Sequence, residues 1–170
     1  MIKKYIDFDN VILATEDLLF QQYFLLKNQG IEIDRKKYVQ EYDWYNLLYR
    51  CEVIGDAIEV LNFMMDACIL TRVYSMDNEG VAKIKYLRDI GIKNDIILAP
   101  YLVKKSDVVN ANGNILVDDN VINLDDWYEK GGIPIFFNKN NLDIDGKGRT
   151  NPGYTKIRTL GELNNIKFSK

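Results

Sequence analysis

Short apolar segments alternate with helical segments along most of the chain, and this alternation limits the possible folds more than any other feature. Helical patterns over residues 17–29, 34–49, 55–65, 77–91 and 121–130 separate five candidate strands. Those strands are residues 3–8, 67–70, 95–99, 115–117 and 133–137. Short buried strands joined by helices predict a parallel sheet with helices on both faces. We therefore expect an α/β, three-layer, Rossmann-like parallel sheet of about five strands.

Residues 16–65 form a long, mostly helical segment between the first two predicted strands. This length predicts a small helical cap inserted after strand one, with residues 1–15 and 66–170 forming the core. Near the C-terminus, residues 138–155 are polar and glycine-rich and are expected to form a loop. Residues 160–163 are expected to form a last short helix.

Four tyrosines of the cap are spaced as on one face of a helix: Tyr38, Tyr42, Tyr45 and Tyr49. One interpretation is that this face packs on neighbouring helices, with the hydroxyl groups reaching water. The other is that Tyr42 and Tyr45 form an aromatic wall over a substrate site.

The composition excludes several classes of protein. The chain has no histidine, which removes histidine acid-base catalysis and the commonest zinc ligand. Cys51 and Cys68 lack metal-binding spacing and are expected to be free thiols of a reducing compartment. No apolar run approaches the roughly 18 residues of a membrane span, and the net charge of −3 disfavours a nucleic-acid polymer as partner. A cytoplasmic protein without membrane or nucleic-acid partners is expected, and its oligomeric state stays open.

Polar side chains follow four of the predicted strands. In a parallel sheet the carboxyl ends of the strands lie along one edge, where ligands collect. Taken singly, each of these residues is typical of a turn or a solvated surface. Together they place carboxylates, a hydroxyl and an ammonium group at one edge. They are Asp7 and Asp9, Thr71, Lys104 and Lys105, and Asp118 and Asp119.

The order of these groups resembles the haloacid dehalogenase (HAD) superfamily of phosphotransferases. Its four motifs are matched by "YIDFDNVI", "CILT", "KKSD" and "ILVDDN". The segment "ILVDDNVINLDDWYEKGGIPIFF" is most similar to the 5′(3′)-deoxyribonucleotidase branch. Asn10 stands where that family usually has glycine, and asparagine tolerates left-handed backbone better than most residues.

The resemblance implies a phosphomonoester hydrolase that works through a phosphoaspartate intermediate. Asp7 would be the nucleophile, and Asp9 would protonate the leaving oxygen and then take a proton from water. Thr71 and a lysine would hold the phosphate oxygens. Lys105 is favoured because it directly precedes "SDVV", and Lys104 stays open.

Clustered carboxylates repel one another and repel a phosphoester, and a divalent cation relieves both repulsions. Oxygen ligands alone suit Mg²⁺. The resemblance implies that Asp7 and Asp118 bind the ion directly and that Asp9 binds through its backbone carbonyl. Asp119 would bind directly or through water.

Several alternatives stay open at this stage. The small-molecule substrate is expected to be a nucleoside 5′-monophosphate, or otherwise a small sugar or acid phosphate. A catalytically idle HAD-like binding or regulatory protein is a second class, although the presence of Asp9 disfavours it. A receiver domain also uses Asp, Thr, Lys and Mg²⁺, but there the acidic pair follows the first strand.

Overall fold

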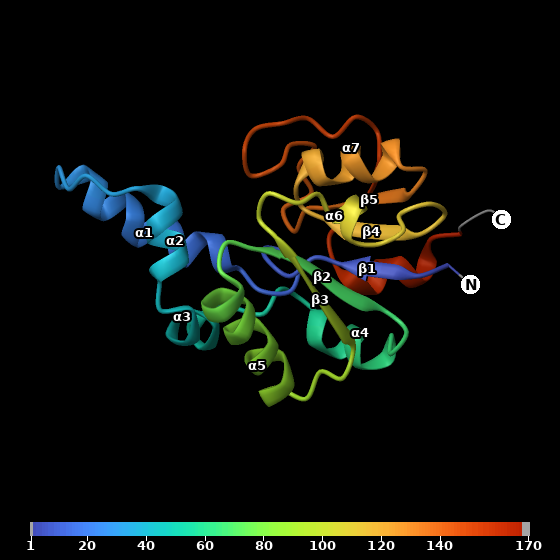
Figure 1. The fold of residues 1–170 in the computed structure, drawn as a ribbon. Coiled ribbons are helices and arrows are strands. Elements are labelled where there is room, and N and C mark those ends of the chain that lie inside the picture. The colour runs from blue at the N-terminus through green and yellow to red at the C-terminus, as the bar shows by residue number, and fades with distance from the viewer. Residues whose placement is uncertain (1, 168–170) are drawn as a thin grey trace.

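The computed structural model describes residues 2–167 and contains one parallel sheet of six strands in the order β3-β2-β1-β4-β5-β6 (Figure 1). The strands are β1 Lys4–Ile6, β2 Cys68–Val73, β3 Asp95–Pro100, β4 Ile115–Asp118, β5 Ile133–Phe137 and β6 Thr155–Ile157. The predicted fold class is therefore confirmed, with one more strand than expected. The sequence did not reveal β6 because this strand has only three residues, of which one is buried.

Helices cover both faces of the sheet. They are α1 Thr15–Asn28, α2 Arg35–Glu41, α3 Trp44–Arg50, α4 Ala57–Phe63, α5 Val81–Asp89, α6 Lys105–Val108 and α7 Val121–Glu129, with a π-helix η1 Met76–Gly80 and a 3₁₀-helix η2 Leu160–Asn165. Neighbouring residues of β4 show how the layers form. Val117 packs with the helices α3, α4 and α5 on one face, whereas Leu116 packs with Leu124 and Trp127 of α7 on the other.

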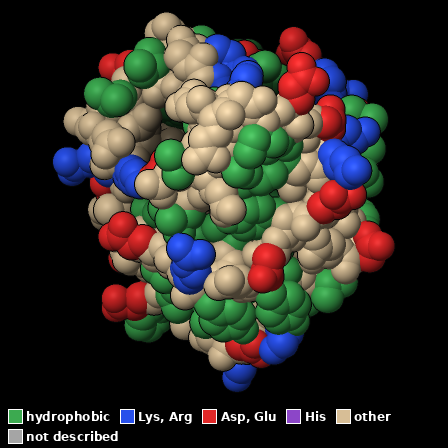
Figure 2. Space-filling view, turned by 90° about the vertical axis from the view of Figure 1, so that its left-hand side faces the viewer, with side chains coloured by type: hydrophobic (Ala, Val, Ile, Leu, Met, Phe, Trp, Pro, Cys, Tyr) green, Lys and Arg blue, Asp and Glu red, His purple; other side chains and the backbone are tan. Residues whose placement is uncertain are grey.

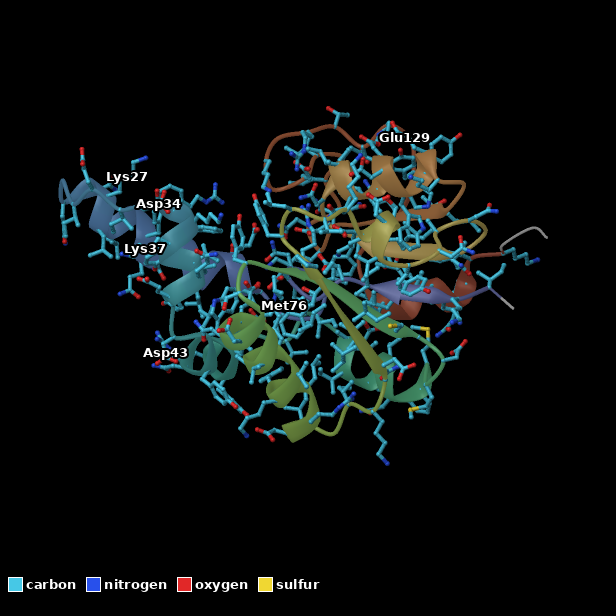
Figure 3. All side chains as sticks on the ribbon, viewed as in Figure 1. Lys27, Asp34, Lys37, Asp43, Met76 and Glu129 are labelled. Atoms are coloured by element: carbon cyan, nitrogen blue, oxygen red, sulfur yellow. The ribbon has the colours of Figure 1, made fainter. Side chains whose placement is uncertain are left out.

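The predicted single helix over residues 34–49 is wrong, because the chain breaks between α2 and α3. Asp34 caps α2 by accepting a hydrogen bond of 2.7 Å from the Lys37 amide. Tyr42 is then extended, and Asp43 caps α3 by accepting 3.0 Å from the Asn46 amide. Figure 3 labels Asp34 and Asp43 at the starts of these two helices. The four tyrosines consequently do not share one helix face.

The helices of residues 16–65 differ in their surroundings. In Figure 1, α1 and α2 extend away from the sheet, and Figure 2 shows the face that carries them, with apolar and charged side chains interspersed. By contrast, Trp44 and Leu47 of α3 and Leu61 of α4 belong to the same apolar core as the strands. The division into a cap of residues 16–65 and a core stays a prediction. Within residues 2–167, none of the helices combines the length and apolarity that crossing a bilayer requires.

Residues 138–154 form a loop, as predicted, and residues 144–150 within it form a hairpin turn before β6 begins. Ile144 pairs with Thr150, and the buried Asp145 carboxylate accepts hydrogen bonds from the Lys147 and Arg149 amides, both at 2.9 Å. Asp145 also accepts 3.2 Å from the Val121 amide at the start of α7. This aspartate therefore fixes the hairpin, and with it the position of Lys147, against the carboxyl edge of the sheet.

Candidate active site

Asp7 and Asp9 lie in the tight turn that follows β1. The Ile12 amide donates 2.9 Å to the Phe8 carbonyl, and the turn requires a left-handed residue at Asn10, whose φ is 57°. The expectation that Asn10 accepts this backbone is confirmed. The turn directs both carboxylates toward the carboxyl edge of the sheet, where both line the same cavity.

Lys105 is the lysine at this edge, whereas Lys104 points elsewhere. Lys105 begins the short helix α6 after β3 and is buried. Its Nζ lies 2.6 Å from Oδ1 of Asp7 and 2.7 Å from Oδ2 of Asp118. Lys104 is exposed and pairs with Asp126. Burial raises the pKa of Asp7 to about 7, against the opposing effect of the Lys105 charge.

Asp118 and Asp119 complete an acidic group with Asp7. One carboxylate oxygen from each of the three lies within 4.8 Å of the others. Asp118 is fully buried and accepts 2.9 and 3.1 Å from Nδ2 of Asn123, and Asn10 Nδ2 donates 3.1 Å to Asp119. Burial, reinforced by repulsion from Asp118 and Asp7, raises the pKa of Asp119 well above its usual value.

This acidic group fits Mg²⁺ by the chemistry of its donors. Its three members offer hard oxygen ligands, and the repulsion that raises the pKa of Asp119 is what a divalent cation relieves. The Asp9 carboxylate is not a member of the group, which agrees with the expectation that Asp9 contributes only its backbone carbonyl. That role of the carbonyl, and the choice between direct and water-mediated binding for Asp119, stay predictions.

A second buried lysine, Lys83 of α5, holds Asp9. Lys83 is completely buried, and its Nζ lies 2.6 Å from Oδ2 of Asp9 and 2.7 Å from Oε1 of Glu79. Thr15 donates 2.7 Å to the other Asp9 oxygen. Burial acts to lower the pKa of Lys83, but Asp9 and Glu79 outweigh it, so the pKa is raised. The sequence analysis did not identify Lys83 or Glu79.

Thr71 lies within β2 rather than after it, since the strand continues to Val73. The Lys83 ammonium donates 3.2 Å to its hydroxyl oxygen, and that hydroxyl donates 3.4 Å to Oδ2 of Asp9. Thr71 is fully buried and does not line the cavity beside Asp7. The structure thus places Thr71 beside Asp9, and its contact with a phosphate oxygen stays a prediction.

A cavity of about 100 Å³ opens beside Asp7, Asp9, Lys105 and Asp119. Neither member of the predicted aromatic wall lines it. Tyr42 donates to Gln22 and borders a different hollow, and Tyr45 is 37% exposed with the Lys85 ammonium 5.7 Å from its ring centre. The helix break at Tyr42 explains this displacement. The aromatic residues that do line the cavity are Phe20, Trp44, Tyr74 and Tyr101.

No protein-family model matches the sequence, and a search of curated proteins finds no match. Solved structures do match the fold. The HAD-hydrolase YfnB from Bacillus subtilis bound to magnesium is 16% identical, with a TM-score of 0.64 over 96% of this chain and 97% of that one. L-2-haloacid dehalogenase from Xanthobacter autotrophicus is 12% identical, with a TM-score of 0.63 over 97% and 98%. A phosphonoacetaldehyde hydrolase-like protein from Oleispira antarctica is 11% identical, with a TM-score of 0.60 over 96% and 90%.

These similarities show that the chain has the fold of the HAD-superfamily hydrolases. At such low identities they carry no information about substrate, and none of these three proteins is described as a nucleotidase. The chemistry of this chain must therefore be argued from its own site.

Proposed function

We propose that the protein is a Mg²⁺-dependent phosphomonoester hydrolase in which Asp7 is the nucleophile. The observation that carries this proposal is the environment of Asp7. Its carboxylate lines an open cavity, pairs with the buried Lys105 at 2.6 Å, and lies beside Asp118 and Asp119. A carboxylate, a fixed ammonium group and an acidic metal-binding group at one cavity are what attack on a phosphate dianion requires.

In the first step, a carboxylate oxygen of Asp7 attacks phosphorus and the bond from phosphorus to the ester oxygen breaks. Asp9 gives its proton to the departing oxygen, which leaves as an alcohol. Bound Mg²⁺ would offset the negative charge that keeps the carboxylate and the phosphate apart. Lys105 lies close enough to Asp7 to hold the phosphate oxygens as their charge shifts.

In the second step, water attacks phosphorus of the phosphoaspartate and Asp9 takes the proton of that water. Inorganic phosphate leaves and the Asp7 carboxylate is restored. The contacts with Lys83 and Thr15 hold the Asp9 carboxylate in place at the cavity.

The size of the cavity favours small sugar or acid phosphates as substrates. Sites for drug-sized ligands usually have volumes of about 300–1,000 Å³. The cavity beside Asp7 has about 100 Å³. Nucleoside 5′-monophosphates are the alternative substrate class, supported only by the resemblance of the "ILVDDNVINLDDWYEKGGIPIFF" segment to nucleotidases.

Hydrolysis of p-nitrophenyl phosphate tests the proposal. We expect turnover in millimolar Mg²⁺ and none in EDTA. Asp7→Asn should lower turnover by more than the roughly 10²–10⁴-fold typical of losing an acid-base group, because an amide does not attack phosphorus. Asp66→Asn, at a largely exposed aspartate paired with Lys4, is the matched control and should behave as the wild type. Turnover by Asp7→Asn at the wild-type rate would refute the assignment.

A further inference from the structure

The cavity beside Asp7 is lined by three cationic side chains that the proposed chemistry does not use. Arg35 comes from α2, Arg72 from β2 and Lys147 from the hairpin turn of residues 144–150. Within residues 2–167, none of the three forms an ion pair with a carboxylate. Three cations from separate segments of the chain therefore converge on one small space.

Aromatic rings, rather than acids, support the two arginines. The Arg72 guanidinium lies 5.5 Å from the Tyr101 ring centre, and Tyr101 itself stacks on Tyr74 at 3.7 Å. The Arg35 guanidinium lies 4.4 Å from the Phe20 ring centre. Contacts with ring faces orient a guanidinium but leave its N–H groups free to donate to a ligand. Among residues 2–167, the Arg72 guanidinium forms one hydrogen bond, a long contact of 3.5 Å with the Tyr101 carbonyl.

Two buried lysines pair with three of the five acids that line the cavity. Lys105 pairs with Asp7, and Lys83 pairs with both Asp9 and Glu79. Glu16 and Asp119 are the remaining acids, and Asp119 belongs to the acidic group proposed to hold Mg²⁺. Burial raises the pKa of Glu16, and Lys147 and Arg35 oppose this effect. Arg35 and Lys147 both act on Glu16, whereas no carboxylate among residues 2–167 forms an ion pair with Arg72. The Arg72 guanidinium is thus available to an anionic group of a ligand.

We propose that Arg72, with Arg35 and Lys147, binds a second anionic group of the substrate, so that the enzyme acts on small phosphomonoesters that also carry a carboxylate. This inference rests on the proposed phosphatase function. A carboxylate suits the planar N–H pair of a guanidinium. It is also smaller than a second phosphate, which matters in a cavity of about 100 Å³.

The first test is binding, which does not depend on turnover. We would measure by calorimetry, in Mg²⁺, the affinity for 3-phosphonopropionate and for 3-hydroxypropylphosphonate, which has a neutral hydroxyl in place of the carboxylate. We expect the acid to bind roughly ten-fold or more tightly, because hydrogen bonds to charged groups are stronger than neutral ones. Arg72→Gln should remove most of this preference, and Arg72→Lys should restore part of it.

Arg158→Gln is the matched control, since Arg158 lies outside the cavity and pairs with Glu162. It should keep the full preference for the acid. Equal affinity of the wild type for both phosphonates would overturn the inference, as would an unchanged preference in Arg72→Gln. Tighter binding of propane-1,3-diyl bisphosphonate than of the acid would indicate that the second anionic group is a phosphate. It would therefore overturn carboxylate-bearing phosphomonoesters as the substrate class.

Turnover separates this inference from the proposed function. The wild type should hydrolyse phosphoglycolate with a higher kcat/KM than 2-hydroxyethyl phosphate, mainly through a lower KM. Hydrolysis of p-nitrophenyl phosphate without any preference between these two esters would overturn the anionic subsite and leave the phosphatase standing. Preferential binding of the phosphonate acid without hydrolysis of any ester would support the anionic subsite and contradict the proposed phosphatase function.

Discussion

Two buried lysines, Lys105 and Lys83, each join two carboxylates, and together they divide the Asp-x-Asp pair that follows β1. Lys105 bridges Asp7 and Asp118, whereas Lys83 bridges Asp9 and Glu79. Lys105 lines the cavity and Lys83 does not. Both aspartates line the cavity, but Asp7 is held by a lysine that also lines it and Asp9 by a lysine that does not. The comparison indicates that the two aspartates are held for different tasks.

The two lysines also differ in what surrounds them. Beside Lys105, Asp7 belongs to an acidic group that can gain a metal ion. Beside Lys83 the site is closed by aromatic rings, with Phe8 and Trp44 5.1 and 5.2 Å from the ammonium. A charge enclosed in this way is costly to leave unpaired. We therefore expect Lys83 to dominate stability and Lys105 to dominate activity.

The largest expected effect is on stability. Lys83→Met should lower the free energy of unfolding by about 3–5 kcal/mol, because it leaves Asp9 and the buried Glu79 without a counter-charge. Chemical denaturation measures this. Lys85→Met, at an exposed position of the same helix, should change stability by less than about 1 kcal/mol. Adding Glu79→Gln to Lys83→Met should recover part of the loss. A Lys83→Met protein as stable as Lys85→Met would show that the buried pair does not hold α5.

The next effect is on the chemical step. Lys105→Met should lower kcat/KM for p-nitrophenyl phosphate by about 10²–10³-fold, the range found when one electrostatic donor to a transition state is removed. Lys104→Met changes the exposed neighbour and should stay within a few-fold of wild type. Similar losses in both variants would end the distinction between the two positions and reopen the choice of phosphate-binding lysine.

A smaller effect concerns metal binding on the Lys105 side alone. Mg²⁺ at 100 times its dissociation constant should stabilise the fold by about 2.7 kcal/mol. Thermal melts in Mg²⁺ and in EDTA measure the difference. Asp118→Asn should shrink it, because Asp118 belongs to the acidic group. Glu79→Gln, on the Lys83 side, should leave the difference between the melts in Mg²⁺ and in EDTA unchanged. Wild-type melts that coincide in the two buffers would contradict a metal site.

The difference between the two lysines also shows what the sequence could reveal. Lys104 and Lys105 share the third place in an ordered set of strand-end residues, and the "SDVV" that follows favoured Lys105. Glu79 and Lys83 are four residues apart, a spacing that is typical of a solvated helix surface. Both are nevertheless buried. Glu79 lies in the π-helix η1 and also accepts 2.7 Å from the Tyr74 amide, and Phe8 and Trp44 enclose Lys83. A single π-turn has no recognisable composition, so this part of the site was not predictable.

The same contrast holds for the fold. The five predicted strands are rich in apolar residues and were found, whereas β6 depends on pairing with β5 and has little apolar content of its own. The helical character of residues 16–65 was predicted, but the break at Tyr42 was not. Aspartate also occurs inside helices, so Asp43 alone did not mark the start of a new helix. That break moved Tyr42 and Tyr45 away from the cavity. Arg72 and Tyr101 became visible as partners only through the pairing of β2 with β3.

The most direct test of the account is to identify which carboxylate becomes phosphorylated. An acid quench during turnover of p-nitrophenyl phosphate, followed by borohydride reduction, converts an acyl phosphate to an alcohol that mass spectrometry locates in the sequence. The account predicts reduction at Asp7 alone, dependent on both Mg²⁺ and ester, and absent in Asp7→Asn. Reduction at Asp9 or Asp118 instead, or turnover with no reducible aspartate, would contradict it.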